Sequence, residues 1–325
     1  MNHPSLLPRI QHGLSTIELV HVPHPRWPLP RSSAATSAVP PTSVHVSVLD
    51  SSFNPPTLAH LALAALPPPS SSPSPSAPPA RAPDFDARLL LLSVRNADKQ
   101  LKPGDATFEQ RVEMMVLLAR DLSSSTAVVP SDPPSASGPS AEGDSNVAVA
   151  IIDEPTFAGK STRLLAFLRA RLAALDLPTP TPGPPPTATS PPDPNLHLTF
   201  LMGTDTLVRF FAPRYYPSQA SMEASLRQFL APDAEDSRIL CAKRMGDGAA
   251  GVLEEEAKAC LPEFARQMVS VQPDRIYFAD IGEKECMYSS SQVRGKIAAG
   301  DPSWRSMVTS AISQYILDNS LYHVS

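Results

Sequence analysis

The sequence predicts an α/β protein with a doubly wound parallel sheet, and three observations support this prediction. Short apolar segments typical of strands alternate with longer amphipathic segments along the chain of 325 residues. The prolines are segregated, because 29 of the 39 fall in four segments and leave the rest of the chain ordinary in composition. Polar motifs recur where strands are expected to end, which is the edge at which parallel sheets bind ligands.

The alternation defines the expected elements. Strands are expected near residues 44–50, 88–93, 146–152, 196–202, 238–242 and 275–279. Helices are expected near residues 57–66, 106–122, 159–176, 204–230, 252–269, 290–299 and 304–319. Such an order produces a parallel sheet with helices on both faces. In the second helix, the charged residues Glu109, Arg111 and Glu113 are expected on an exposed face, opposite an apolar core face, and are not expected to take part in chemistry.

The domain organisation follows from the proline-rich segments. We expect a partly disordered N-terminal extension, 1–43, followed by a single domain, 44–325. Its Pro/Ser-rich inserts are expected to be mobile because they have few apolar side chains to bury, and they lie at 67–83, 130–140 and 178–194. Extended proline-rich loops can also bind protein partners. A short amphipathic helix that packs on the core is allowed near the N-terminus by Leu6, Leu7, Ile10, Leu14 and Ile17.

The strongest functional signal is the string SSFNPPTLAHL at residues 51–61, which follows the apolar run VHVSVL at 44–49. A strand that turns into a helix through small residues and prolines leaves free backbone N–H groups at the helix N-terminus, where anions bind. Thr57 and His60 are three residues apart, so they share one face of the first helical turn and can meet the same phosphate. The alternative is a strand, a turn and a structural histidine.

This string resembles the T/H-x-G-H signature of the nucleotidylyltransferase superfamily, written G-x-F-x-P-x-H/T-x-x-H. The most similar branch is the nicotinamide mononucleotide adenylyltransferase family, in particular its divergent fungal members with SSFNPP. The resemblance implies a Rossmann-like fold in which Ser52 and Phe53 belong to the nucleotide site. Ser51 stands where most members have glycine, and Ala59 stands for the glycine of H-x-G-H, so either side chain narrows the space for a phosphate near the backbone.

A second string, YSSSQVR at residues 288–294, resembles the family's I-S-S-T-x-I-R motif at the start of a helix. Ser290 and Ser291 can donate through both hydroxyl and backbone N–H groups. Arg294, one turn later, offers a planar fork that suits phosphate oxygens. The alternative is an ordinary serine N-cap followed by a solvated arginine.

Three further segments match the family at strand ends. The string LTFLMGTDTL at residues 198–207 ends in a G-x-D motif, in which the resemblance implies that Gly203 lets the backbone approach the nucleotide. Asp205 would bind a ribose hydroxyl, or cap the next helix. Arg244 matches a strand-terminal arginine near adenosine. Lys99 resembles the lysine that faces the mononucleotide phosphate, with a solvated loop lysine as the alternative.

The string GKST at residues 159–162 suggests a phosphate-binding Walker loop, but its context is wrong. That motif needs glycine at the position held by Glu154, which is followed by Pro155, so the cradle of N–H groups cannot form. We therefore expect an ordinary helix start. In relatives this region covers the nicotinamide ring with an aromatic side chain, and Phe157 is the candidate here.

Composition and charge limit the classes of binding partner and the compartments that we expect for this protein. The net charge is −5 without a basic run, so nothing indicates nucleic acid or an anionic membrane surface. Cys241, Cys260 and Cys286 lack a C-x-x-C spacing, so we expect reduced thiols and no structural zinc. Apolar runs are too short to span a bilayer, and the N-terminus has no signal or transit pattern. We expect a cytoplasmic or nuclear protein.

The resemblance implies adenylyl transfer from ATP to nicotinamide mononucleotide (NMN), which gives NAD and pyrophosphate by direct in-line attack of the acceptor phosphate on the α-phosphorus. His60 and Thr57 would hold the α- and β-phosphates, and Arg294 with Ser290 and Ser291 would hold the β- and γ-phosphates. Catalysis would consist of positioning and charge stabilisation. Mg²⁺ would arrive with ATP, largely coordinated by water, and no residue is expected as a metal ligand.

Two alternatives remain. A sister transferase would use the same nucleotide motifs with another acceptor, such as nicotinic acid mononucleotide, phosphopantetheine or, with CTP, an alcohol phosphate. A protein of a different class would bind or hydrolyse ATP as a regulator and recruit partners through its proline-rich loops. Ser51 and Ala59 are the sequence features that favour this second alternative.

Overall fold

The computed structural model describes residues 6–30, 42–69, 84–95, 104–125, 146–175, 195–242, 263, 266–267 and 275–323. Its strands are β1 (Ile17–His21), β2 (Ser43–Asp50), β3 (Ala87–Ser93), β4 (Val147–Ile152), β5 (Asn195–Gly203), β6 (Arg238–Ala242) and β7 (Ile276–Ala279). Its α-helices are α1 (Leu6–Gln11), α2 (Leu58–Ala65), α3 (Phe108–Ser125), α4 (Phe157–Ala174), α5 (Thr204–Phe210), α6 (Gln219–Leu230), α9 (Ser290–Ala298) and α10 (Ser310–Asp318). Short 3₁₀ helices are η2 (Pro213–Tyr215), η4 (Glu285–Met287) and η5 (Pro302–Met307).

One sheet organises the described part of the chain, with strand order β1-β4-β3-β2-β5-β6-β7. All neighbouring strands are parallel except β1, which pairs antiparallel with β4 at one edge. From β2 the chain proceeds through β3 and β4 toward one edge, and from β5 through β6 and β7 toward the other. The mixed α/β architecture with a doubly wound, mostly parallel sheet is confirmed.

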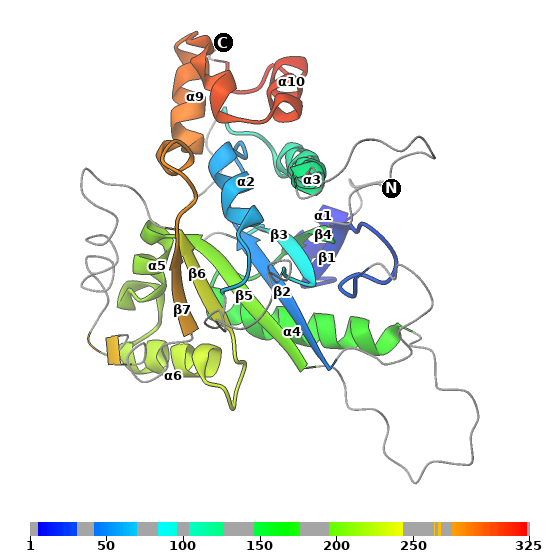
Figure 1. Cartoon of the computed structure of the whole chain (residues 1–325), viewed down its shortest axis with the longest axis vertical. Helices are drawn as coiled ribbons and strands as arrows, with labels where there is room; N and C mark the ends of the chain where they lie inside the picture. The colour runs from blue at the N-terminus through cyan, green and yellow to red at the C-terminus, as the bar shows by residue number, and fades with distance from the viewer. Residues whose placement is uncertain are drawn as a thin grey trace, which may run out of the picture.

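Helices cover both faces of this sheet (Figure 1). Strand β4 is apolar throughout, and β3 is nearly so, because both faces of these strands are buried. In β3, Leu90 and Leu92 join the core beneath α2, α3 and α10, whereas Leu89 and Leu91 join the core beneath α4 and α6. The period of two along a strand therefore divides the apolar side chains between two cores. No helix in these described ranges is both long and apolar enough to cross a membrane.

Two expected helices are interrupted. The helix expected at 204–230 is wrong as one element, because α5 ends at Phe210 and α6 starts only at Gln219. Pro213 opens η2, and Ser218 caps α6 by accepting from the N–H group of Ser221 at 3.1 Å. Proline lacks the N–H group that a continuous helix needs, so the break is local in origin.

The helix expected at 304–319 is also divided, into η5 and α10, where Thr309 accepts from the N–H group of Ile312 at 3.3 Å. The helix expected at 252–269 lies almost entirely outside the described residues, as do the inserts 130–140 and 178–194 and most of 67–83.

The N-terminal segment contributes more to the fold than the sequence indicated. Leu7 and Ile10 of α1 are buried as expected, but Leu14 is 73% exposed and Ile17 begins strand β1, which was not expected. Trp27 is fully buried, and its indole N–H group donates to the carbonyl of Asn146 at 3.2 Å. The described part of this segment is therefore an integral layer of the domain.

Replacing Trp27 with alanine should lower the free energy of unfolding by about 3–5 kcal/mol, the usual cost of deleting a large buried aromatic side chain. Urea unfolding followed by circular dichroism measures the change. Leu14→Ala is the matched control, because Leu14 is exposed and its loss should change the unfolding free energy by less than about 0.5 kcal/mol. Equal stabilities of the two variants would show that the segment around Trp27 does not belong to the core.

Candidate active site

The topology places a switch point between β2 and β5. These strands are neighbours, and the connections that follow them lead to opposite edges of the sheet. Ligands of open α/β sheets bind outside the carboxyl ends of the strands at such a switch point. The first motif follows β2 after Asp50, and the G-x-D motif follows β5 at Gly203.

The turn between β2 and α2 has a demanding backbone. Phe53 has a φ of 44°, in the left-handed region that a bulky residue rarely adopts, and its side chain is fully buried. The ring centroids of Phe53 and His60 lie 5.3 Å apart. Phe53 therefore contributes a wall behind the histidine, and it can face a ligand only through its backbone. Such conformations concentrate at functional sites, where the surrounding structure enforces them.

His60 is held at both ring nitrogens. The backbone N–H group of Thr57 donates to Nδ1 at 3.0 Å, and the hydroxyl of Ser51 lies 3.0 Å from Nε2. Because an N–H group can only donate, Nδ1 must accept and the ring proton belongs on Nε2. Desolvation by burial lowers the pKa of His60 to about 4. The imidazole is therefore a neutral donor at pH 7, oriented by its own helix N-terminus.

Thr57 lies beside His60, as the spacing of the two residues predicted. It is fully buried at the N-cap of α2, and its hydroxyl lies 2.9 Å from Nδ1 of His60. The expected shared face with His60 exists, but the hydroxyl is directed at the histidine. Thr57 therefore acts in this structure by orienting the ring, and its direct contact with phosphate stays a prediction.

The second motif meets the first across more than 230 residues of sequence. The hydroxyl of Ser290 donates to the carbonyl of Pro55 at 2.8 Å, and Nη1 of Arg294 donates to the carbonyl of Asn54 at 2.5 Å. Nη2 of Arg294 also contacts the exposed Ser291 hydroxyl at 3.4 Å. The residue that caps α9 is Ser289, which accepts from the N–H group of residue 292 at 3.3 Å. The alternative of a serine cap is thus correct for Ser289, but the arginine is not simply solvated.

A buried polar cluster fixes this meeting point. The amide of Asn54 donates to Asp105 at 2.7 Å and accepts from the Tyr322 hydroxyl at 2.9 Å. Asp105 also lies 3.6 Å from Arg294 and 3.7 Å from Arg111. A guanidinium carries more N–H donors than the contacts of Arg294 use, so it can hold the turn and still present donors to an anion.

Arg111 is the main correction to the expected surface residues. It was expected on an exposed face, but it is buried, with Nε donating to the carbonyl of Ala106 at 2.9 Å and Nη1 to the carbonyl of Ser52 at 3.4 Å. Burial lowers the pKa of the Arg111 guanidinium, and the carboxylate of Asp105 acts in the opposite direction. The backbone of Ser52 in the turn after β2 is therefore held in place by the side chain of Arg111.

The strand end at β5 is open. A Cβ atom built on Gly203 would meet no atom within 4 Å, so packing in the described structure does not require glycine there. Open space at the switch point is consistent with close approach of a ligand. Asp205 is exposed in the first turn of α5, whose N-cap position belongs to Gly203. Lys99 and Arg244 lie outside the described residues.

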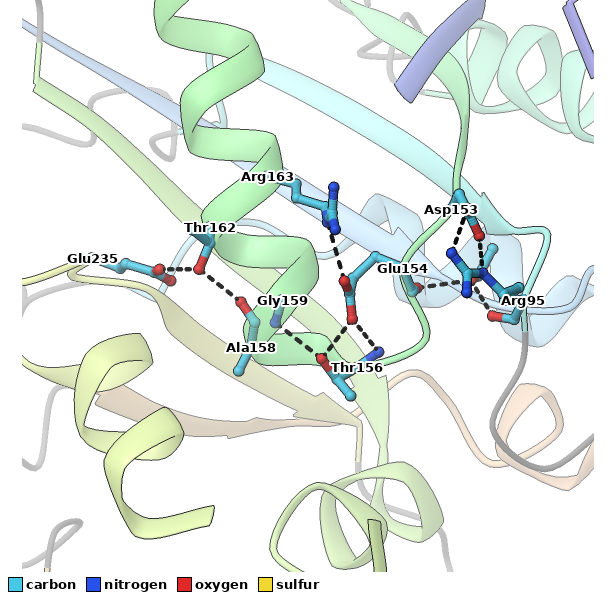
Figure 2. Close-up of polar contacts among 10 residues, drawn as sticks. Arg95, Asp153, Glu154, Thr156, Ala158, Gly159, Thr162, Arg163 and Glu235 are labelled. Atoms are coloured by element: carbon cyan, nitrogen blue, oxygen red, sulfur yellow. Dashed lines mark hydrogen bonds and ion pairs between the residues drawn. The ribbon is translucent and has the colours of Figure 1, made fainter. Parts of the chain in front are cut away.

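The N-terminus of α4 shows why the GKST string does not bind phosphate as a Walker loop. Figure 2 shows the Glu154 carboxylate beside this terminus, where it accepts from the backbone N–H group of Thr156 at 3.1 Å and from its hydroxyl at 2.8 Å. A Cβ atom on Gly159 would collide with the Glu154 carboxyl group. The protein's own anion therefore occupies the place that a phosphate would need, and Arg163 neutralises it at 3.1 Å.

Lys160 of the same string has another partner. It is buried and its Nζ lies 2.5 Å from Asp50, the last residue of β2. Its ammonium also lies 5.0 Å from the centroid of Phe157. Phe157, which is partly buried, packs edge-on against the fully buried Phe200. The expectation that Phe157 covers a nicotinamide ring remains a prediction.

Several residues at this site were missed, namely Asp50, Asn54, Asp105, Arg111, Lys160 and Tyr322. Two of them carried a local signal. Lys160 lies four residues before Leu164, and Arg111 lies four residues before Met115, so each occupies a core-facing position of its helix. A charged residue at such a position is rarely buried without a partner. Asp105 and Tyr322 have no local signal, because their roles come from long-range contacts.

Comparison with known proteins confirms the resemblance to the nucleotidylyltransferase superfamily. No family model matches the chain. One curated relative, from Schizosaccharomyces pombe, is 28% identical over 262 residues, which cover 79% of this chain and 77% of that protein. It is named "Putative nicotinamide mononucleotide adenylyltransferase".

Two solved structures of nicotinic acid mononucleotide adenylyltransferase from Plasmodium falciparum also match. The complex with NaAD gives a TM-score of 0.45 at 13% identity and covers 86% of this chain and 98% of that chain. The complex with APC gives a TM-score of 0.43 at 11% identity, with coverages of 86% and 97%. At these values the structures carry no information on the substrate of this chain.

The neutral state of His60 predicts a pH dependence of stability. Its pKa is lower in the folded protein than the usual 6.5, so between about pH 6.5 and pH 4 the unfolded chain binds the extra proton and acid favours unfolding. The contribution to stability is complete above pH 6.5 and falls by about 1–2 kcal/mol on acidification to pH 5. Urea unfolding at pH 7.5 and pH 5 measures the change.

His60→Gln is the comparison variant, because glutamine keeps a polar side chain that does not titrate. The difference in unfolding free energy between the two pH values should be smaller in this variant than in the wild type. Equal differences in the two proteins would show that His60 titrates normally.

Proposed function

We propose that this protein transfers the adenylyl group of ATP to NMN and produces NAD and pyrophosphate. The observation that carries the proposal is the meeting of the two motifs: Arg294 and Ser290 contact the carbonyls of residues 54 and 55, beside His60 and the switch point of the sheet. The curated relative is named for the same reaction class and supports the proposal over most of the chain.

The chemistry needs no protein base. The 5′-phosphate of the acceptor is already ionised at neutral pH, so one of its oxygens attacks the α-phosphorus directly. The bond between the α-phosphorus and the bridging oxygen to the β-phosphorus breaks, and pyrophosphate leaves with that electron pair. The protein must align the two phosphates and stabilise the negative charge that redistributes between them.

The site residues divide this work. His60 would serve the α- and β-phosphates as a neutral donor through its Nε2–H group, which lies 3.0 Å from the Ser51 hydroxyl in this structure, while Thr57 sets the orientation of the ring. Arg294, with Ser290 and Ser291, would supply the permanent positive charge and donors for the β- and γ-phosphates. Arg294 and Ser290 also hold the turn that leads to His60, so phosphate binding and the positioning of His60 are linked.

Other residues would define the nucleoside and the acceptor. Gly203 leaves room at the end of β5, and Asp205 would accept from a ribose hydroxyl. Arg244 would lie near adenosine, and Lys99 would face the acceptor phosphate. Mg²⁺ would arrive with ATP and be coordinated largely by the triphosphate and water.

His60→Ala and Arg294→Ala should each lower kcat by roughly 10²–10³, the usual cost of removing one preorganised donor that stabilises developing charge. The Kd for MgATP should rise less than kcat falls, because the contacts strengthen in the transition state. Arg294→Lys should restore only part of the activity, since an ammonium lacks the two-point fork. Steady-state kinetics of pyrophosphate release, with titration calorimetry for MgATP, separate the two effects.

Arg120→Ala is the control for this series, because Arg120 is exposed on α3 away from the motifs and should keep wild-type kinetics. A folded His60→Ala protein that makes NAD at the wild-type rate would contradict the proposed clamp.

The acceptor is tested by incubating the protein with MgATP and NMN, nicotinic acid mononucleotide or phosphopantetheine, and identifying the products by mass spectrometry. We expect NMN to be used at least as well as nicotinic acid mononucleotide, because the SSFNPP string resembles the eukaryotic branch of the family. A kcat/KM tenfold higher for another acceptor would reassign the substrate. Release of orthophosphate without any dinucleotide would instead indicate an ATP-hydrolysing protein.

A further inference from the structure

Ser51 stands where most members of the superfamily that the string resembles have glycine, and the structure gives its side chain a specific partner. Its hydroxyl lies 3.0 Å from Nε2 of His60, the nitrogen that carries the ring proton. A glycine at this position would leave Nε2 without this contact. Serine in place of glycine therefore adds a hydrogen-bond partner at Nε2, whereas Nδ1 has its partner in Thr57 at the start of α2.

The direction of this hydrogen bond follows from the other side of the ring. Nδ1 accepts from the backbone N–H group of Thr57, so Nε2 carries the proton and donates to the oxygen of Ser51. A hydroxyl that accepts one hydrogen bond still has its own proton to donate. In the described structure no acceptor is recorded for that proton, and Ser51 keeps part of its surface exposed.

The surroundings favour an anion beside Ser51. The preceding residue, Asp50, would repel a phosphate, but Lys160 lies 2.5 Å from its carboxylate and neutralises it within the core. The backbone N–H group of Ser51 donates to the carbonyl of Leu91 at 3.3 Å, which fixes the residue at the end of β2. The hydroxyl thus lies at the switch point without an adjacent uncompensated negative charge.

We propose that Ser51 is a further catalytic residue, whose hydroxyl donates a hydrogen bond directly to an oxygen of the transferred phosphate while His60 orients it. This inference rests on the proposed adenylyl transfer, and it deepens that proposal by extending the phosphate donor of His60 to a serine–histidine pair. No proton is transferred, because His60 donates a hydrogen bond to Ser51, Ser51 donates one to the phosphate, and both side chains stay neutral. Cooperative chains of this kind strengthen the terminal donor.

The test compares Ser51→Ala and Ser51→Gly with the wild type, in both the native and the His60→Ala background. Each single Ser51 variant should lower kcat about 10- to 100-fold, the range for losing one hydrogen bond to a charged group, with the KM for NMN changed less than twofold. In the His60→Ala background, Ser51→Ala should cost less than about threefold, because the orienting partner is already absent.

If Ser51 had a purely structural role, its substitution would lower the thermal stability and would not lower kcat selectively relative to the change in KM. Ser124→Ala is the control for loss of a serine hydroxyl, because Ser124 is exposed at the end of α3 and bonds only to the carbonyl of Arg120 at 3.2 Å. A Ser51→Gly protein as fast as or faster than the wild type would overturn the proposal. Equal losses from Ser51→Ala in both backgrounds would do the same.

The inference can fail separately from the proposed function. If the wild type makes no dinucleotide with any acceptor, adenylyl transfer is wrong, and Ser51 is then judged on MgATP affinity alone by titration calorimetry. In that case Ser51→Ala and Ser51→Gly should each weaken MgATP binding at least threefold relative to the Ser124→Ala control. Unchanged affinity would overturn the role of Ser51, and a wild type that does not bind MgATP would overturn both proposals.

Discussion

The hydrogen bond from Arg294 to the carbonyl of Asn54 is the contact on which the site depends. The turn after β2 leaves the helical and strand patterns, so its carbonyl groups need partners from elsewhere. Arg294 and Ser290 supply those partners from α9, at the other end of the chain. The left-handed Phe53 and the N-cap of α2 are therefore stabilised by a helix that folds on them from the C-terminal part of the sequence.

The charges around this turn are arranged to favour an anion. Asp50 is paired with Lys160, whereas Asp105 is shared between Arg111 and Arg294. One carboxylate near two guanidiniums leaves a local excess of positive charge in a partly buried environment, where charges interact more strongly than in water. His60 adds no charge to this balance, because burial keeps its imidazole neutral at pH 7. The positive charge of the site is therefore permanent, and His60 contributes a neutral hydrogen-bond donor with a fixed orientation.

Much of the fold could be predicted from the sequence, because the signals are local. The strand runs VHVSVL and VAVAII and the helix-forming segments between them define β2, β4 and their neighbours within one or two residues. The wrong predictions also have local causes. A continuous helix was expected at 204–230 although Pro213 interrupts it, and strand β1 was missed because it is short and lies at the sheet edge.

The site was predictable only as far as its motifs. Family resemblance selected His60 and Arg294, and the structure shows how these motifs meet. The resemblance could not show that the hydroxyl of Thr57 is directed at His60, because that orientation depends on the buried geometry of the turn. Nor could it find Asp105 or Tyr322, whose contacts with Asn54 join segments far apart in sequence. Lys99 and Arg244 remain predictions from resemblance.

The most direct test is a crystal structure of the protein with Mg²⁺, NMN and an ATP analogue that carries a methylene group between the α- and β-phosphorus atoms. The account predicts that the phosphates lie outside the carboxyl ends of β2 and β5, with the α-phosphate within hydrogen-bonding distance of Ser51 or His60 and the β- and γ-phosphates beside Arg294. A nucleotide bound elsewhere on the sheet, or one whose phosphates touch none of these three side chains, would contradict it.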